Sequence, residues 1–151
     1  MYHVANAATM KPAWTALVAA SCQACNAAST AVSGSSVYGV GTPAGLMFSL
    51  AGDSGSTNGT APIADGIHYE SVSAADGVVW TVDNAADLDG FDAATGQTLV
   101  RRPISADAGA PIPNLTSSGI PIAEHKLFVA AGGGGYASSP GYVIASRAAA
   151  P

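Results

Sequence analysis

Residues 77–100 read GVVWTVDNAADLDGFDAATGQTLV, and this stretch decides the fold. Val, Trp, Phe and Thr recur in it, and these residue types favour the pleated, half-buried surface of a β-sheet. Between them stand Asp-Asn and Thr-Gly pairs, which are typical of turns. The stretch therefore predicts three short strands joined by two tight turns, with strands at residues 77–82, 87–91 and 97–100 and turns at residues 83–86 and 92–96.

Weaker copies of this unit lie on both sides of it. The aromatic residue of its first strand, Trp80, has counterparts in Tyr38 and Phe128, which lie 42 residues before it and 48 residues after it. Residues 6–14 line up with residues 92–100 at an offset of 86, which is two repeats of 43. Self-similarity at a fixed period is typical of repeat proteins. The chain is therefore predicted to consist of units of about 40 to 50 residues.

Units of this length with four short strands are typical of β-propeller blades. Helical repeats of similar length are the competing interpretation. The chain is rich in Gly, Ser and Thr and has no long stretch of apolar residues at helical spacing. Residues 14–28 form the one helix-like segment, and they fit a connection between two blades equally well. We therefore expect an all-β fold of β-propeller blades, each with four antiparallel strands.

Residues 90–100 resemble the repeat of the quinoprotein, or PQQ-type, β-propeller family. That repeat has a strand followed by Ala-x-Asp-x-x-Thr-Gly-x-x-x-Trp, and in the family the Trp docks each blade onto its neighbour. This copy keeps Asp92, Thr95 and Gly96 but has Val100 at the Trp position. The resemblance implies a structural role for the three turn residues.

Residues 4–14 are similar to the same repeat in a complementary way. They keep Thr9 and Trp14 but have Asn6 in place of Asp and Met10 in place of Gly. The resemblance implies that Trp14 is a structural residue that docks one blade onto the next. Such blades occur in alcohol dehydrogenases, in assembly scaffolds and in carbohydrate- or peptide-binding proteins, so the resemblance implies a fold and leaves the function open.

The length of 151 residues suits one domain with a real core but is too short for a closed propeller. We expect a single propeller-type domain over residues 1–151, with about three and a half blades. The predicted array starts and stops within a blade. The sequence is therefore interpreted as a piece of a longer chain, or as one part of an assembly that other copies complete. The breaks between blades are expected near residues 17–29, 63–67 and 104–117.

Charge is sparse in this chain. Only 10% of the residues are charged, the net charge is −5 and the isoelectric point is about 4.7, which argues against a nucleic-acid partner. Little charge with abundant Ala, Gly, Ser and Thr suits a bacterial protein outside the cytoplasm, either periplasmic or secreted. The chain has no run of 18 apolar residues, so no membrane span is expected.

Cys22 and Cys25 form a CxxC motif. Covalent haem attachment would need His directly after the second Cys, where Asn26 stands instead. Zinc would need two further ligands, and no second Cys pair or paired His motif supplies them. A structural disulfide in a connection between blades and a pair of free thiols remain the two interpretations.

Gly-Asp-Ser-Gly at residues 52–55 matches the surroundings of the nucleophile in chymotrypsin-like proteases. A Ser nucleophile needs a His base, and the only upstream His is His3, within a segment that matches a blade. We therefore interpret residues 52–55 as a turn after a strand. His3, His68 and His125 occupy different repeat positions, so we expect surface or inter-strand histidines and no shared metal site.

Asp83, Asp87, Asp89 and Asp92 form an acidic cluster. Asp-x-Asp spacing near Gly occurs in calcium loops, but the EF-hand pattern with its closing Glu is missing here. Solvated acids in turns are therefore the leading interpretation, with a weak calcium site as the alternative. The sequence assigns no catalytic residue and no metal ligand.

The leading prediction is a non-enzymatic binding or assembly scaffold that contacts a protein or saccharide partner through its rim loops and needs no cofactor. A piece of a PQQ-dependent quinoprotein dehydrogenase is the first alternative, and the resemblance implies PQQ and calcium only in that case. No active-site motif of those enzymes is matched, and their vicinal Cys-Cys pair is missing. A self-assembling extracellular structural protein is the second alternative.

Overall fold

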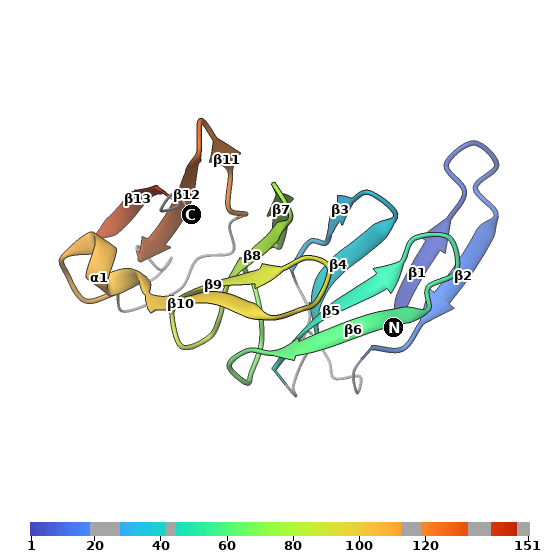
Figure 1. The fold of residues 1–151 in the computed structure, drawn as a ribbon, viewed down its shortest axis with the longest axis horizontal. Helices are drawn as coiled ribbons and strands as arrows, with labels where there is room; N and C mark the ends of the chain where they lie inside the picture. The colour runs from blue at the N-terminus through green and yellow to red at the C-terminus, as the bar shows by residue number, and fades with distance from the viewer. Residues whose placement is uncertain (19–27, 42–44, 113–118, 133–139, 148–151) are drawn as a thin grey trace.

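A computed structural model describes residues 1–18, 28–41, 45–112, 119–132 and 140–147. It contains four separate antiparallel sheets, each built from strands that follow one another in the chain. The sheets stand face to face in a row, in chain order (Figure 1). This arrangement confirms the predicted all-β fold with four-stranded propeller blades. We call the sheets blades 1 to 4.

Blades 2 and 3 have four strands each, and blades 1 and 4 have two and three. Blade 1 comprises β1 (Tyr2–Ala5) and β2 (Pro12–Ala16). Blade 2 comprises β3 (Ala31–Ser33), β4 (Ser36–Gly41), β5 (Leu46–Ala51) and β6 (Thr57–Pro62). Blade 3 comprises β7 (Ser73–Ala75), β8 (Val78–Val82), β9 (Asp87–Asp92) and β10 (Thr98–Pro103). Blade 4 comprises β11 (Ile122–Ala123), β12 (Lys126–Gly132) and β13 (Gly141–Arg147).

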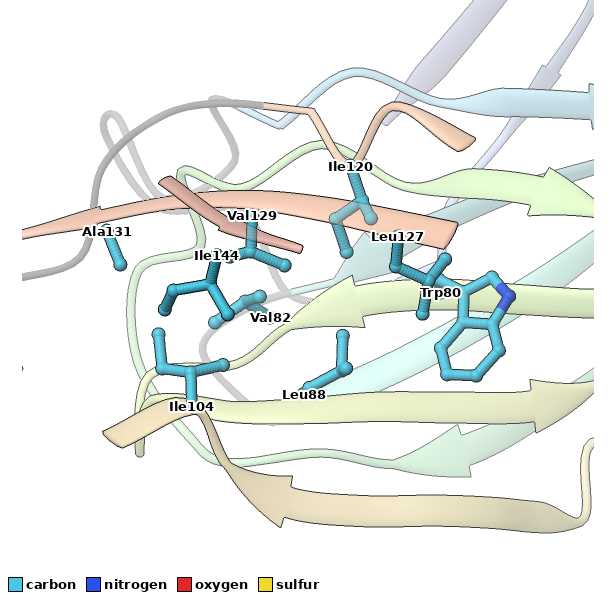
Figure 2. Packing of buried hydrophobic residues seen from close by; sticks show 9 residues of the cluster. All are labelled: Trp80, Val82, Leu88, Ile104, Ile120, Leu127, Val129, Ala131 and Ile144. Atoms are coloured by element: carbon cyan, nitrogen blue, oxygen red, sulfur yellow. The ribbon is translucent and has the colours of Figure 1, made fainter. Parts of the chain in front are cut away.

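Most of the core that the structure describes lies in two apolar layers between blades, and the buried Phe48 and Leu50 belong to neither layer. In β8 the side chains alternate between the two layers, because successive residues of a strand point to opposite faces. Trp80 and Val82 join the layer between blades 3 and 4 (Figure 2), whereas Val79 joins the layer between blades 2 and 3. A strand that is buried on both faces reads as a continuous apolar run, and this explains the VVWTV sequence of β8.

Two glycines at strand centres make room for aromatic rings. Gly90 pairs with Trp80, and a Cβ atom at position 90 would lie 2.6 Å from the indole ring. Gly39 pairs with Phe48 in blade 2, and a Cβ atom there would lie 2.4 Å from the phenyl ring. Each aromatic ring therefore lies over the backbone of the neighbouring strand, where any larger residue would displace it.

The segment after β10 is a short helix, α1 (Ile104–Ala108), in a region where only a break between blades was expected. Its Ile104 is buried in the layer between blades 3 and 4, and Gly109 ends the helix in the left-handed conformation. The helix-like interpretation of residues 14–28 is wrong at its start, because residues 14–16 complete β2. Within the described residues, no helix has the length and apolar character needed to span a membrane.

Candidate binding site between two blades

Within the part of the chain that the structure describes, one turn occurs three times, at residues 6–11, 51–56 and 92–97, each time between the last two strands of a blade. In each copy the fifth residue donates its backbone N–H to the first carbonyl, at 2.7 to 2.8 Å. The fifth residues are Met10, Gly55 and Gly96, and their φ angles are 56°, 73° and 73°. Glycine adopts this left-handed conformation without strain, so Met10 is the costly member of the set.

In the first and third copies the first side chain organises the backbone of the turn, whereas the second copy begins with Ala51. The Asp92 Oδ1 atom accepts hydrogen bonds from the amides of Ala94 and Thr95 and from the Thr95 hydroxyl, at 3.1, 2.7 and 2.8 Å. These donors, with the Thr95 hydroxyl first, hold the pKa of Asp92 below its usual value. Asn6 Oδ1 accepts the same three bonds in blade 1, at 2.9 to 3.1 Å. Asn and Asp are therefore equivalent at this position, because only an oxygen acceptor is needed.

We expect Asp92→Asn to leave the thermal midpoint of unfolding close to that of the native protein, since Asn6 makes the same turn. Asp92→Ala is expected to lower that midpoint, because three donors lose their acceptor. Thermal unfolding followed by far-UV circular dichroism measures both variants. Equal losses for Asn and Ala would contradict this role of the side chain.

Trp14 connects blade 1 to the turn of blade 2. Its indole N–H donates to the carbonyl oxygen of Gly52 at 2.9 Å. A Cβ atom on Gly55 would lie 2.4 Å from the ring, so the indole lies directly against this glycine. Trp14 thus contacts the second turn, and the docking role that the repeat resemblance implies for it stays a prediction.

The junction between blades 2 and 3 lacks this indole. Strand register makes Gly59 the counterpart of Trp14, because Trp14 pairs with Val4 and Gly59 pairs with Ser49, each two residues before the turn. Ala93 is likewise the counterpart of Gly52, and its carbonyl oxygen accepts a hydrogen bond from the Tyr38 hydroxyl at 3.1 Å. Tyr38 therefore supplies a hydrogen bond to the carbonyl oxygen that corresponds to that of Gly52, and Gly59 leaves the side-chain position open.

A cavity of about 410 Å³ lies at this junction, and we call it the interblade slot. Its volume is in the range of small-ligand pockets, roughly 300 to 1,000 Å³. The apolar side of the slot continues the layer between blades 2 and 3, and the polar side is made by turns and by the strand residues next to them. The apolar side chains are Tyr38, Met47, Ala61, Val79 and Phe91. The other lining residues are Gly34, Ser35, Ala93, Ala94, Thr95 and Gly96 in turns and Ser33, Ser36, Phe48, Ser49, Asn58, Gly59, Thr60 and Asp92 in strands.

Elsewhere between the same two blades lies a buried charge pair. Asp89 is fully buried, and its Oδ1 atom accepts a hydrogen bond from Arg101 Nε at 2.7 Å. Arg101 also donates to the carbonyl oxygen of Pro62 in blade 2, at 2.7 Å. Burial raises the pKa of Asp89 to about 6, although the guanidinium opposes this shift.

The interpretation of the acidic cluster as solvated is wrong for two of its members. Asp89 has no exposed surface, and Asp83 is 2% exposed. Asp83 accepts hydrogen bonds from the amides of Ala64, Ala85 and Asp87, at 2.9 to 3.1 Å. These carboxylates are buried because protein donors replace the water they lose.

His68 and Glu70 are also buried, in the segment between β6 and β7. A surface position is therefore wrong for His68, which stands in a short β-bridge, whereas His3 and His125 are exposed. His68 Nε2 lies 2.9 Å from the carbonyl oxygen of Ala64, and burial lowers the pKa of His68. Among the described residues, neither His68 Nδ1 nor the Glu70 carboxyl oxygens have a hydrogen-bond partner. Burial raises the pKa of Glu70 to about 7.

Glu70 is expected to make stability depend on pH. Its folded-state pKa lies above the usual 4.5, so its contribution is present at low pH and is lost as the pH rises through 7. We expect the free energy of unfolding to fall by about 2 to 3 kcal/mol between pH 5 and 8 from this group, and Glu70→Gln to remove that fall. Urea unfolding at four pH values measures it, with the exposed Glu124→Gln as control. An unchanged pH slope in Glu70→Gln would contradict the assignment.

The remaining predicted residues lie apart from the slot or beyond the described chain. Cys22 and Cys25 lie outside the described residues. Within the described ranges, no group of three or more His, Cys, Asp or Glu side chains is arranged to hold a metal ion. Residues 52–55 form part of the second turn, between β5 and β6.

The sequence interpretation missed the residues that give the slot its character. Of the family pattern, the second copy of the turn keeps only Gly55. The alignment of this copy with the family repeat therefore did not extend to Gly59. Counting eight residues on from the first residue of each turn would have identified Gly59 as the counterpart of Trp14. No local signal identifies Tyr38 as the residue that crosses to blade 3, because its partner Ala93 is 55 residues away.

No protein-family model and no curated protein matches the sequence. Among solved structures, the chain is similar to BamB from Moraxella catarrhalis, with a TM-score of 0.59 and 13% identity over 80% of this chain and 34% of that chain. It is also similar to the quinohemoprotein alcohol dehydrogenase ADHIIG from Pseudomonas putida HK5, with a TM-score of 0.61 and 18% identity over 83% of this chain and 20% of that chain. The computationally designed Ika4 protein gives a TM-score of 0.53 and 13% identity over 78% of this chain and 68% of that chain.

The first two of these are β-propeller proteins. The fold is that of propeller blades. The chain spans about a third of the length of BamB and a fifth of that of the dehydrogenase. At such low identity, the likeness shows the fold alone.

Proposed function

We propose that this chain is a non-enzymatic binding scaffold of the quinoprotein-repeat type that works outside the cytoplasm. The observation that carries the proposal is the interblade slot. A cavity of about 410 Å³ opens between two blades and has an apolar floor and a rim of turns. Concave, mostly apolar sites with a few polar groups are where proteins bind ligands and side chains.

The rim of the slot offers polar groups in a defined arrangement. Asn58 Nδ2 donates to the hydroxyls of Ser36 and Ser49, at 3.4 and 3.2 Å. On the opposite side, Asp92 keeps the third turn in shape, and Ala94 stands exposed at its tip. Loops on a rigid blade scaffold commonly carry recognition, because the sheet holds them in place. These features support a protein partner, with a saccharide as the other candidate ligand.

The contacts among the described residues support neither the dehydrogenase alternative nor the self-assembling alternative. The dehydrogenase alternative rests on the repeat resemblance, and the self-assembling alternative rests on the predicted blade count. The slot supports binding directly, so the scaffold is the function that the geometry supports best.

The proposal is tested by probing a peptide array and a glycan array with the labelled chain. We expect ligands that bind the native chain and are lost in a double variant of the rim, Ser35→Arg with Ala94→Arg. A matched variant, Ala13→Arg with Thr15→Arg, adds the same charge to exposed positions of β2 outside the slot and should keep binding. Lack of binding to both arrays, or ligands that the rim variant retains, would contradict the proposal.

A further inference from the structure

We infer that the interblade slot takes the indole side chain of a tryptophan from a partner protein. The inference rests on the proposed scaffold function and names the group that the slot recognises. It follows from comparing two junctions of the same chain, one with an indole in place and one without.

The junction between blades 1 and 2 shows how an indole sits in this repeat. The Trp14 ring lies against Gly55, and its N–H reaches the carbonyl oxygen of Gly52 at 2.9 Å. The seat therefore consists of a left-handed glycine, which leaves the ring face free of a side chain, and a carbonyl acceptor three residues earlier.

The junction between blades 2 and 3 keeps the same seat. Gly96 has the φ angle of Gly55, 73°, and closes the same hydrogen-bonded turn. The two seats differ in whether an aromatic ring lies against the glycine. A Cβ atom on Gly55 would overlap the Trp14 ring, whereas a Cβ atom on Gly96 would meet only the Thr60 carbonyl oxygen, at 3.9 Å. The glycine face is thus formed but has no ring against it.

The acceptor is also present. The Ala93 carbonyl oxygen accepts the Tyr38 hydroxyl at 3.1 Å. A carbonyl oxygen has two lone pairs, so it retains the capacity to accept an indole N–H. Next to it, Met47, Val79 and Phe91 provide the apolar floor. Thioether and aromatic groups pack well against an indole ring.

The chain has no tryptophan of its own for this seat. It has two tryptophans, and Trp14 is docked on the preceding turn while Trp80 is buried in the layer between blades 3 and 4. The counterpart residue, Gly59, has no side chain. An indole that occupies the slot must therefore come from another molecule. Its flat apolar body and single N–H donor match a floor of apolar side chains beside one carbonyl.

The experiment uses N-acetyl-L-tryptophanamide as the probe, titrated into the whole chain by calorimetry and by amide NMR. We expect saturable binding, with shifts confined to residues that line the slot, at positions 33–36, 38, 47–49, 58–61, 79 and 91–96, and N-acetyl-L-leucinamide binding roughly tenfold more weakly or worse. The NMR map requires no variant, so it tests the inference independently of any mutant.

Gly59→Trp is the decisive variant, because it should place the chain's own indole in the slot and abolish probe binding. A Cβ atom at position 59 meets nothing within 4 Å, and the φ angle of Gly59 lies outside the left-handed region, so the backbone accepts the change. Leu99→Trp, at a 51% exposed position outside the slot, is the control and should bind the probe normally. Gly59→Phe serves in the same way should Gly59→Trp misfold.

Three results are distinguishable. Probe binding that Gly59→Trp blocks and Leu99→Trp keeps supports the inference. Absence of probe binding, with array ligands still lost in the rim variant, overturns the indole assignment and leaves the scaffold proposal standing. Absence of both overturns both.

Discussion

Arg101→Met is expected to lower the free energy of unfolding by about 3 kcal/mol at pH 7.5. Asp89 is fully buried and Arg101 is its ion-pair partner, so the variant leaves a carboxylate without water and without a counter-charge. The side chain of Arg101 is itself 41% exposed, which places the expected loss at the lower end of the range for buried pairs.

The loss in Arg101→Met should shrink at acid pH. The pKa of Asp89 is already raised to about 6 with Arg101 present, and removing the guanidinium raises it further. A buried acid with a raised pKa contributes stability at low pH that disappears as the pH rises through that pKa. At pH 5 the Asp89 carboxyl is therefore neutral in the variant, and most of the cost is relieved.

Urea unfolding of the native chain and the variant at pH 5 and 7.5 measures this difference. Arg102→Met is the matched control, because Arg102 pairs with the partly exposed Asp107 and should cost less than about 1 kcal/mol. A loss in Arg101→Met that is equal at both pH values would show that the cost is not the buried charge.

Trp14→Ala is expected to lower the free energy of unfolding of blade 1 by about 2 kcal/mol. The indole is half-buried, so the loss is below that of a fully buried aromatic ring. Trp14→Phe keeps a ring against Gly55 but loses the bond to Gly52, and we expect about half of the loss.

Which blade loses stability in Trp14→Ala is as informative as how much stability is lost. In a repeat array each unit contacts only its neighbours, so removing the docking ring should loosen blade 1 and leave blade 3 unchanged. Hydrogen exchange by NMR should therefore speed up for amides of β1 and β2 only. Equal acceleration in β8 and β9 would contradict a docking role for Trp14.

Most of the strand pattern was predictable because it depends on local chemistry. The three strands expected in residues 77–100 are present as β8, β9 and β10, with ends that differ by at most three residues. The turn at Asp92 is equally local, because the carboxylate and its donors lie within four residues. Alternating apolar runs and Asx turns need no distant partner, so the sequence alone predicts them.

The acidic cluster shows where local reasoning fails. Asp87 and Asp89 stand two residues apart in the same strand, yet Asp89 is buried while Asp87 is only partly covered. What separates them is the partner: Arg101 and the neighbouring blade enclose Asp89. The burial of His68 and Glu70 has the same origin. It results from how the blades pack around them, and the residues next to them in the sequence do not indicate that packing.

By itself, the sequence determined the all-β fold, the four-stranded unit, its period and the turns that close it, because short-range hydrogen bonds and the two-residue strand period produce them. Only the tertiary structure decided how each blade packs against the next one. In the sequence, Gly59 looks like any other glycine of a strand. In the fold, the turn of blade 3 lies beside it, and Gly59 lines the open cavity of about 410 Å³ between the two blades. The physical reason is that the contacts between blades join residues 38 and 55 positions apart, whose mutual distance depends on how the sheets stack.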